Sequence, residues 1–174
     1  MEIRIAVPDD LPQILEIYNE VILNTTAVYS YEPHTLEMRA AWFKERKENG
    51  FPVLVAVKEN KIAGFCTYGH FRAWPAYKFT VESSVHIHMD YRGKGIAKQL
   101  MQVLINYAKT NNVHVIMAGI DAHNEVSIAL HKKLGFEITG TLKEVGFKFD
   151  RWLDLTFMEL IVRQTPKREA GNIQ

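Results

Sequence analysis

The sequence predicts a single α/β domain in which a mixed central β-sheet is flanked by helices, and three observations lead to this fold class. The chain has 174 residues, which suits one domain of ordinary size. Hydrophobic residues make up 47% of it, enough to form a core without disulfides. Segments with strand and helix periodicity follow one another in the order β-α-α-β-β-β-α-β-α-β-β, an alternation typical of α/β domains.

The N-terminal third is predicted to contain one strand and two helices. Residues 3–6 suit a short strand, and Asp9 and Asp10 then precede Pro12 as candidate caps of a first helix. Apolar residues recur at helical spacing from Leu11 to Val21, which extends this helix to about Leu23. A polar and aromatic loop follows, and a second helix is expected over 35–49, before the break at Gly50.

The rest of the chain is predicted to complete the sheet. A four-residue link at 58–61 between two β-rich runs favours a hairpin, and an amphipathic pattern indicates a helix after Gly95, with Ile96, Leu100, Val103, Leu104, Tyr107 and Ala108 on its apolar face. We expect a domain over 1–162 and a frayed tail over 163–174. The expected elements are strands over 52–57, 62–68 and 80–89, a helix over 95–111, a strand over 113–120, a helix over 124–134, and an antiparallel pair over 136–145 and 152–162.

Charge and cysteine content restrict the possible functions. The formal net charge is +1, which argues against a general nucleic-acid or membrane-surface binder. Cys66 is the only cysteine, so neither an internal disulfide nor a cysteine-cluster metal site is possible. The chain begins with charged residues where a signal peptide has an apolar run, and no stretch reaches the length of a membrane span. We therefore expect a cytoplasmic protein.

A glycine-bearing turn between a strand and a long helix is the most informative local pattern. Such a turn exposes backbone N–H groups at the positive end of the helix dipole, where they can bind a pyrophosphate. The segment does not match a P-loop, because Lys94 is followed by Gly95 and not by serine or threonine. It also lacks the third glycine of a dinucleotide fingerprint. The candidate anion-binding residues are Arg92, Gly93, Lys94, Gly95, Ile96, Ala97 and Lys98.

Two motifs at matching spacing resemble those of one enzyme superfamily. The pattern Arg92-x-x-Gly95-x-Ala97 resembles the acetyl-CoA motif of the GNAT acetyltransferases, and the segment from Asn124 to Phe136 resembles their next motif. Finer features resemble the phosphinothricin N-acetyltransferase and methionine sulfone/sulfoximine acetyltransferase branch, namely residues 80–85, the loop around Arg72, and residues 140–152. The similarity extends from about Ile3 to Leu160. It implies a GNAT-like domain, acetyl-CoA as co-substrate, transfer to the α-amine of an amino acid, and a homodimer.

The resemblance also implies chemical roles. An amine attacks a thioester only when it is neutral, and Glu82 is the candidate base that removes its proton. The backbone N–H of Val85 would stabilise the oxyanion, and Val85, His86 and Ile87 would line the pantetheine arm together with Asn124. His131 stands where many superfamily members have a tyrosine. It could protonate the departing thiolate, hydrogen-bond the sulfur, or be a structural histidine.

Substrate residues are expected on two loops and one strand. Arg72 is the candidate ligand of a substrate carboxylate because its guanidinium can bind both oxygens. Lys148 is expected to bind an anionic tail of the substrate. The remaining candidates are Ala73, Trp74, Tyr31, Ser83 and Ser84, with Glu82 also contacting the amine.

Other interpretations remain open or are disfavoured. His86 and His88 lie two apart on a strand, but histidines are common there without a metal, and we expect no metal site. No nucleophile-elbow motif is present.

The acceptor could instead be a protein N-terminus, a polyamine or an aminoglycoside, although the basic Arg72 loop favours an anionic acceptor. Outside enzymes, the chain could be a non-catalytic acyl-CoA sensor.

Overall fold

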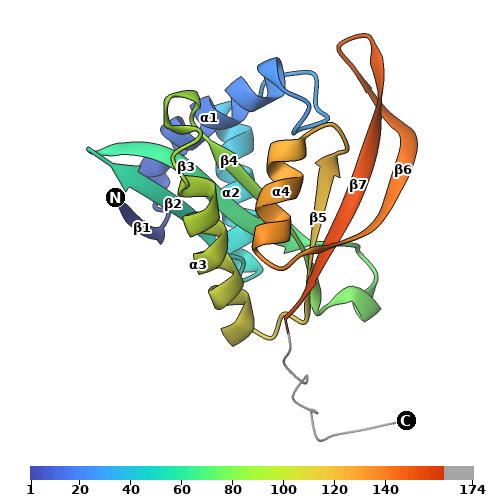
Figure 1. Ribbon diagram of the computed structural model, residues 1–174. Helices are drawn as coiled ribbons and strands as arrows, with labels where there is room; N and C mark the ends of the chain where they lie inside the picture. The colour runs from blue at the N-terminus through green and yellow to red at the C-terminus, as the bar shows by residue number, and fades with distance from the viewer. Residues whose placement is uncertain (163–174) are drawn as a thin grey trace, which may run out of the picture.

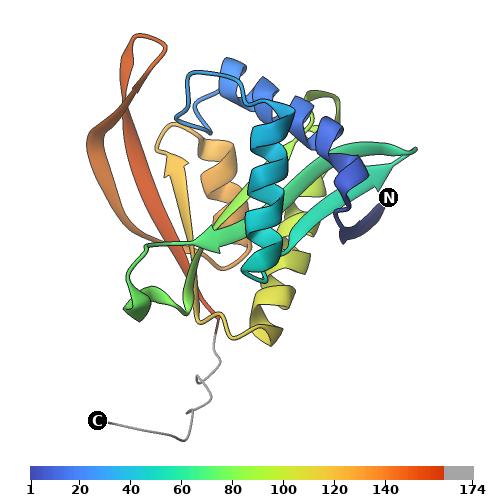
Figure 2. The same ribbon diagram turned by 180° about the vertical axis from the view of Figure 1, so that it is seen from behind.

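The structure is a computed structural model that describes residues 1–162, so the predicted tail over 163–174 lies outside the described residues. One seven-stranded sheet forms the centre, with strand order β1-β2-β3-β4-β5-β7-β6. Helices α3 and α4 cover one face of this sheet (Figure 1). Helices α1 and α2 cover the opposite face (Figure 2).

The observed elements follow in the predicted order and with the predicted types. Boundaries differ by a few residues, most at β6, which continues three residues further than expected because it pairs with β7 up to its turn. The bounds are β1 Glu2–Ile5, α1 Leu11–Asn24, α2 Leu36–Glu48, β2 Val53–Lys58, β3 Lys61–His70, β4 Thr80–Ile87, α3 Ile96–Thr110, β5 Val115–Asp121, α4 Glu125–Lys133, β6 Glu137–Lys148 and β7 Arg151–Ile161.

Two local predictions were wrong. Asp10 does not cap α1 through its side chain; its carboxylate accepts from the Val7 N–H at 2.8 Å and binds the Arg4 guanidinium at 2.7 Å. On α3, Val103 is 37% exposed, whereas Met101 and Ile105 are buried. Successive side chains of an α-helix are rotated by about 100° around its axis. This rotation places Met101 and Ile105 within the side of α3 that faces the sheet and Val103 just outside that side.

Two apolar clusters hold the helices to the sheet. On the α3 side, Leu54, Leu100 and Leu104 are almost fully buried, and Cys66 is a free thiol in this cluster. On the other side, α1 residues such as Ile14 pack against Phe65 of β3. Burial of such side chains stabilises each helix by roughly 1.5–3 kcal/mol per large residue. Within residues 1–162 no helix has the length and apolarity to cross a membrane.

The sheet opens at its centre, between β4 and β5, the only strands within residues 1–162 that pair in parallel. Strands β4 and β5 pair in parallel from Thr80 to Glu82, opposite Val115 to Met117, and their ladder then stops. On its other side β4 stays paired with β3 as far as Ile87. Helix α3 connects the two strands on one face (Figure 1). Beyond Glu82, the edge of β4 that faces β5 therefore carries backbone groups without a strand partner.

Candidate active site

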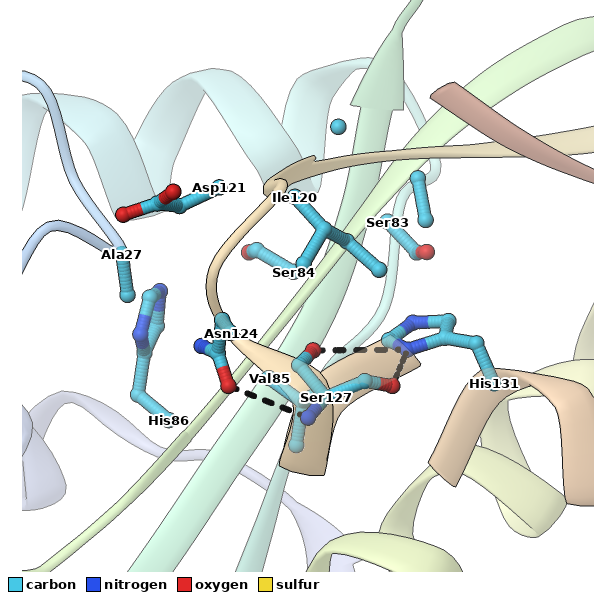
Figure 3. Close-up of a pocket in the computed structure, with 12 residues that line it drawn as sticks. Ala27, Ser83, Ser84, Val85, His86, Ile120, Asp121, Asn124, Ser127 and His131 are labelled. Atoms are coloured by element: carbon cyan, nitrogen blue, oxygen red, sulfur yellow. Dashed lines mark hydrogen bonds between the residues drawn. The ribbon is translucent and has the colours of Figure 1, made fainter. Parts of the chain in front are cut away.

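A narrow pocket lies where β4 and β5 separate (Figure 3). Helix α4 lies along one side of it, and Ala27 and Asp121 lie on the other. Its lining residues include Ser83, Ser84, Val85 and His86 of β4, Ala118, Gly119, Ile120 and Asp121 of β5, and Asn124, Ser127 and His131 at α4. We refer to this pocket as the central slot.

A glycine turn follows the carboxyl end of β4. Gly93 and Gly95 have φ of 73° and 76°, a left-handed conformation that costs other residues about 1 kcal/mol or more. Gly95 is the N-cap residue of α3 and offers no side-chain cap, so the N–H groups of the first helical turn point outward without a side-chain acceptor. We call the backbone from Gly93 to Lys98 the cradle. Its N–H groups at the start of α3 suit an anion, and binding of an anion here remains a prediction from the sequence.

Two of the three basic residues predicted to bind the anion, Arg92 and Lys94, already have protein partners. Arg92 donates from Nε to the Ile87 carbonyl at 3.2 Å and forms an ion pair with Glu20 of α1. Lys94 donates to the Asp90 carbonyl at 2.8 Å. Glu20 was not predicted, because nothing in its own helix indicates a partner 72 positions away. The backbone N–H groups of the first turn of α3 remain available to an anion here.

The cradle and the central slot suit two parts of acetyl-CoA, its pyrophosphate and its pantetheine arm. Both α3 and α4 begin beyond the carboxyl ends of parallel strands, so the two helix N-termini and the unpaired edge of β4 face the same region. That edge, at Val85, suits an extended amide-bearing chain that adds to the strand, while the cradle suits a pyrophosphate. Ile87 does not line the slot; it packs against the core on the α3 side.

Asn124 and His131 lie on the α4 side of the slot (Figure 3). The Asn124 side-chain oxygen accepts from the Ser127 N–H at 3.0 Å and caps the helix, which leaves its amide nitrogen free to donate into the slot. His131 is 4% exposed, and its Nδ1 donates to the Ser127 carbonyl at 2.8 Å.

This bond determines which form of His131 faces the slot. Burial lowers the pKa of His131, so the ring is neutral, and with the proton on Nδ1 its Nε2 can only accept a hydrogen bond. A neutral ring of this tautomer cannot protonate a thiolate from Nε2. Of the three roles open for His131, the geometry favours the structural one over the acid.

Glu82 lies on β4 at the last residue pair before the strands separate. Burial raises the pKa of its carboxyl group, and the nearby Arg72 guanidinium partly offsets this effect. A side chain at Gly119 would place its Cβ 3.0 Å from the Glu82 Oε1, so the missing side chain of Gly119 leaves room for this carboxylate. A half-buried carboxylate with a raised pKa suits a general base.

A second and larger cavity of about 370 Å³ opens beside Glu82 on the face covered by α1 and α2. Its volume falls within the range of small-ligand sites. It shares Ala27, Ser83, Ser84, His86 and Gly119 with the central slot, so the two spaces meet next to Glu82. We call it the acceptor cavity. Tyr18, Arg39, Trp42 and Arg46 also line it, and none of these four was predicted.

Only some of the predicted substrate residues line the central slot or the acceptor cavity. Ser83 and Ser84 line both spaces. The loop that carries Arg72, Ala73 and Trp74 is exposed and does not line the acceptor cavity; Trp74 is 74% exposed. Arg72 nevertheless lies close enough to Glu82 to influence its pKa.

Tyr31 lies outside the acceptor cavity. Its hydroxyl donates to the Phe147 carbonyl of β6 at 2.5 Å, and the residue is 61% exposed. The contact joins the loop after α1 to the β6–β7 hairpin. Tyr31 thus holds this loop to the hairpin and does not line either cavity.

Lys148 corrects a prediction. Its ammonium group donates to the carbonyls of Ile22 at 2.6 Å, Thr25 at 2.9 Å and Val28 at 2.8 Å, and the residue is 3% exposed. An ammonium has three donors, and all three are used, so none remains for a substrate tail. Lys148 instead attaches the β6–β7 hairpin to the end of α1 and to the loop that lines the acceptor cavity.

The two candidate metal histidines do not converge. Burial and the nearby Arg39 guanidinium lower the pKa of His86 to about 4, and its ring packs edge-on against Tyr18. His88 accepts from the Asp90 N–H outside the slot. Among residues 1–162 no group of three potential metal ligands comes together.

Comparison with known proteins identifies the family. The family model for the acetyltransferase (GNAT) domain matches residues 3–157. The L-methionine sulfoximine/L-methionine sulfone acetyltransferase of Pseudomonas aeruginosa is 47% identical over 91% of this chain and 92% of its own length. The L-amino acid N-acyltransferase of Escherichia coli is 39% identical over 98% of this chain and 99% of its own.

Solved structures agree with this match. A putative acetyltransferase of Salmonella typhimurium, solved with acetyl-CoA, superposes with a TM-score of 0.95 at 38% identity and covers 98% of this chain and 99% of its own. A phosphinothricin acetyltransferase of Sinorhizobium meliloti, also solved with acetyl-CoA, superposes with a TM-score of 0.93 at 36% identity. The match covers 97% of this chain and 94% of that structure's chain. The slot, the cradle and these matches together place the chain in the GNAT family of acetyl-CoA-dependent N-acetyltransferases.

Proposed function

We propose that this protein transfers the acetyl group of acetyl-CoA to the α-amine of a small amino acid or amino-acid analogue. Methionine sulfone, methionine sulfoximine and phosphinothricin are the first candidate acceptors, because they are named for relatives at 31–47% identity. The observation that carries the proposal is the meeting of the central slot and the acceptor cavity beside Glu82.

Each residue then has a defined task. The Glu82 carboxylate accepts a proton from the acceptor's ammonium group, which leaves a neutral amine to attack the thioester carbon. The backbone N–H of Val85 donates to the carbonyl oxygen as it gains charge. A C–N bond forms, the C–S bond breaks, and the nitrogen, cationic after the attack, loses its second proton. Because neutral His131 holds its proton on Nδ1, we assign both the removal of this second proton and the protonation of the departing thiolate to solvent water.

Binding groups flank these reacting atoms. The cradle backbone binds the pyrophosphate, and the Asn124 amide donates to the pantetheine arm. Arg72 binds the acceptor's α-carboxylate, which lies two bonds from the amine and so must lie near Glu82. The electrostatic influence of Arg72 on Glu82 supports this placement.

We further propose that the protein acts as a homodimer in the cytoplasm, without nucleic-acid or membrane partners. The β6–β7 hairpin supports the dimer, because Phe147, Phe149 and Trp152 expose 44–61% of their surface there. The net charge of +1 supports the absence of nucleic-acid and membrane partners, because these usually bind strongly basic surfaces. Light scattering on the purified protein tests the dimer, and a monomeric mass would refute it.

The deciding experiment measures CoA-thiol release with acetyl-CoA and a panel of amines. The panel contains methionine sulfone, methionine sulfoximine, phosphinothricin, glutamate and an aromatic amino acid, with a polyamine and a peptide as controls. We expect turnover with free amino acids only. Turnover of the polyamine or the peptide alone would overturn the proposed acceptor class. Acetyl-CoA binding without turnover of any amine would indicate a sensor.

A further inference from the structure

The acceptor cavity has a cationic wall that no assigned role uses. Helix α2 brings Arg39 and Arg46, seven residues apart and hence on one face of the helix, to this wall. Arg39 is only 2% exposed. The Arg46 guanidinium lies against Gly69, where an added Cβ would come within 2.7 Å of it. Gly69 is the β3 partner of Glu82, so Arg46 lies beside the strand pair that carries the candidate base.

Neither arginine is neutralised by a buried carboxylate. Arg39 donates from Nη2 to the Nδ1 of His34 at 3.1 Å, and its Cζ lies 3.8 Å from the centroid of the Tyr18 ring. Burial and Arg39 itself lower the pKa of His34, which therefore accepts as a neutral ring. Arg46 binds Glu45, whose side chain is 47% exposed. Among residues 1–162, only the Nε atoms of Arg39 and Arg46 are buried side-chain nitrogen or oxygen atoms without a hydrogen bond.

Buried guanidinium groups keep their charge and are costly without a counter-ion. Arg39 is such a group and has no carboxylate partner. Arg46 is half-buried, and its partner Glu45 is itself half-exposed, so the two arginines place two positive charges and two unpaired Nε–H groups on one cavity wall. This combination suits a ligand that supplies an anionic group. The ligand's length follows from the cavity: its amine must lie at Glu82, and its far end then lies against α2. Tyr18, Trp42 and Phe65 line the space between and can pack against methylene groups.

We propose that Arg39 and Arg46 form a subsite for an oxygen-rich, anionic or strongly polar group at the end of the acceptor's side chain. This inference rests on the proposed function and narrows its substrate class to amino acids whose side chains end in a carboxylate, phosphinate or sulfone. The subsite takes the role that the sequence suggested for Lys148. Arg72 remains the ligand of the α-carboxylate.

The test compares two acceptor classes in matched variants. Arg39→Met and Arg46→Met keep a long side chain and remove the charge. Lys44→Met on the same helix is the control, since the Lys44 side chain is 76% exposed. We expect each arginine variant to lower kcat/KM for methionine sulfone, phosphinothricin and glutamate by about 30-fold or more, mainly through KM. The kcat/KM for norleucine, whose side chain has no oxygen, should change by less than about threefold.

Equal losses for the two acceptor classes would overturn the subsite and indicate a structural role, as would unchanged values for both. Melting curves without ligand accompany the kinetics, because Arg39 also hydrogen-bonds His34 and stacks on Tyr18, so a loss of stability must be separated from a loss of acceptor binding. If Arg39→Met does not fold, Arg46→Met carries the test. The wild-type panel separates the two proposals. Turnover of free amino acids without preference for oxygen-bearing side chains refutes the subsite alone, whereas turnover of other amines only refutes the proposed function.

Discussion

At the scale of single residues, environment decides what an ionisable group can do. Glu82 and Lys148 were both predicted to contact substrate, but only Glu82 faces a cavity. The Lys148 ammonium is saturated by three carbonyls. His131 shows the same principle, because one bond to the Ser127 carbonyl determines which nitrogen carries the proton.

Replacing Glu82 tests the base directly. We expect Glu82→Gln to lower kcat by about 100-fold, because an amide cannot accept the ammonium proton. Since burial raises the pKa of Glu82, wild-type activity should fall as the pH decreases through that raised pKa, where the carboxylate becomes protonated. The variant should lack this acidic limb in a pH profile of kcat/KM. The exposed Glu48→Gln serves as control, and near-wild-type activity of Glu82→Gln at every pH would refute the role.

Replacing Lys148 tests the attachment of the hairpin. Lys148→Met leaves one buried and two partly buried carbonyls without their donor, so we expect the free energy of unfolding to fall by about 2 kcal/mol or more in urea titrations. The KM for the acceptor should rise because Ala27 and Val28 both line the acceptor cavity, and the KM for acetyl-CoA should change less, because only Ala27 also lines the central slot. Lys143→Met, on the exposed part of the same strand, should stay near wild type. An unchanged stability of Lys148→Met would contradict the structural role.

At the scale of elements, the separation of β4 and β5 creates the site. Parallel strands joined by a helix leave two helix N-termini at one edge of a sheet, and the early end of the ladder leaves a strand edge between them. The glycine turn before α3 leaves the N–H groups of the first turn of this helix accessible to an anion, since no side chain caps them. The cofactor site is thus a property of backbone geometry more than of side-chain identity.

Substitutions at Gly95 test this conclusion. Gly95 has φ of 76°, and an added Cβ would meet nothing within 4 Å, so the conformation alone penalises a side chain. We expect Gly95→Val to weaken acetyl-CoA binding by about tenfold, because valine disfavours the left-handed region that the turn requires. Gly95→Asn should be milder, since asparagine tolerates that region. Calorimetric titration with acetyl-CoA measures both, and equal effects of the two substitutions would show that backbone conformation is not the cause.

At the scale of the whole molecule, we expect the two faces of the sheet to serve different ligands. The side of α3 and α4 provides the acetyl-CoA groups, and the side of α1 and α2 encloses the acceptor cavity (Figures 1 and 2). Glu82 and Gly119 lie where the two spaces meet. The Glu20–Arg92 ion pair also joins the two sides, because it holds α1 to the turn that precedes α3.

Ligand binding should therefore stabilise the entire fold. With acetyl-CoA at a hundredfold excess over its Kd, mass action predicts about 2.7 kcal/mol of added stability. Melting curves should show a rise in Tm that grows with the logarithm of the ligand concentration. Gly95→Val is the matched control and should show a smaller rise at the same concentration. No rise in the wild-type protein would contradict acetyl-CoA binding at this site.

The sequence by itself determined the element order, the glycine cradle, the family and the candidate base. These features depend on local periodicity, on turn chemistry and on motifs that occupy a few consecutive residues. Only the tertiary structure decided the partners of side chains that meet across long stretches of chain. Lys148 and the Ile22 carbonyl are 126 positions apart. Arg39 and Arg46 look like an exposed helix face in sequence and become a cavity wall only when α2 packs on the sheet. Packing brings distant residues together and excludes water from them, and both effects are invisible in a linear pattern of residue types.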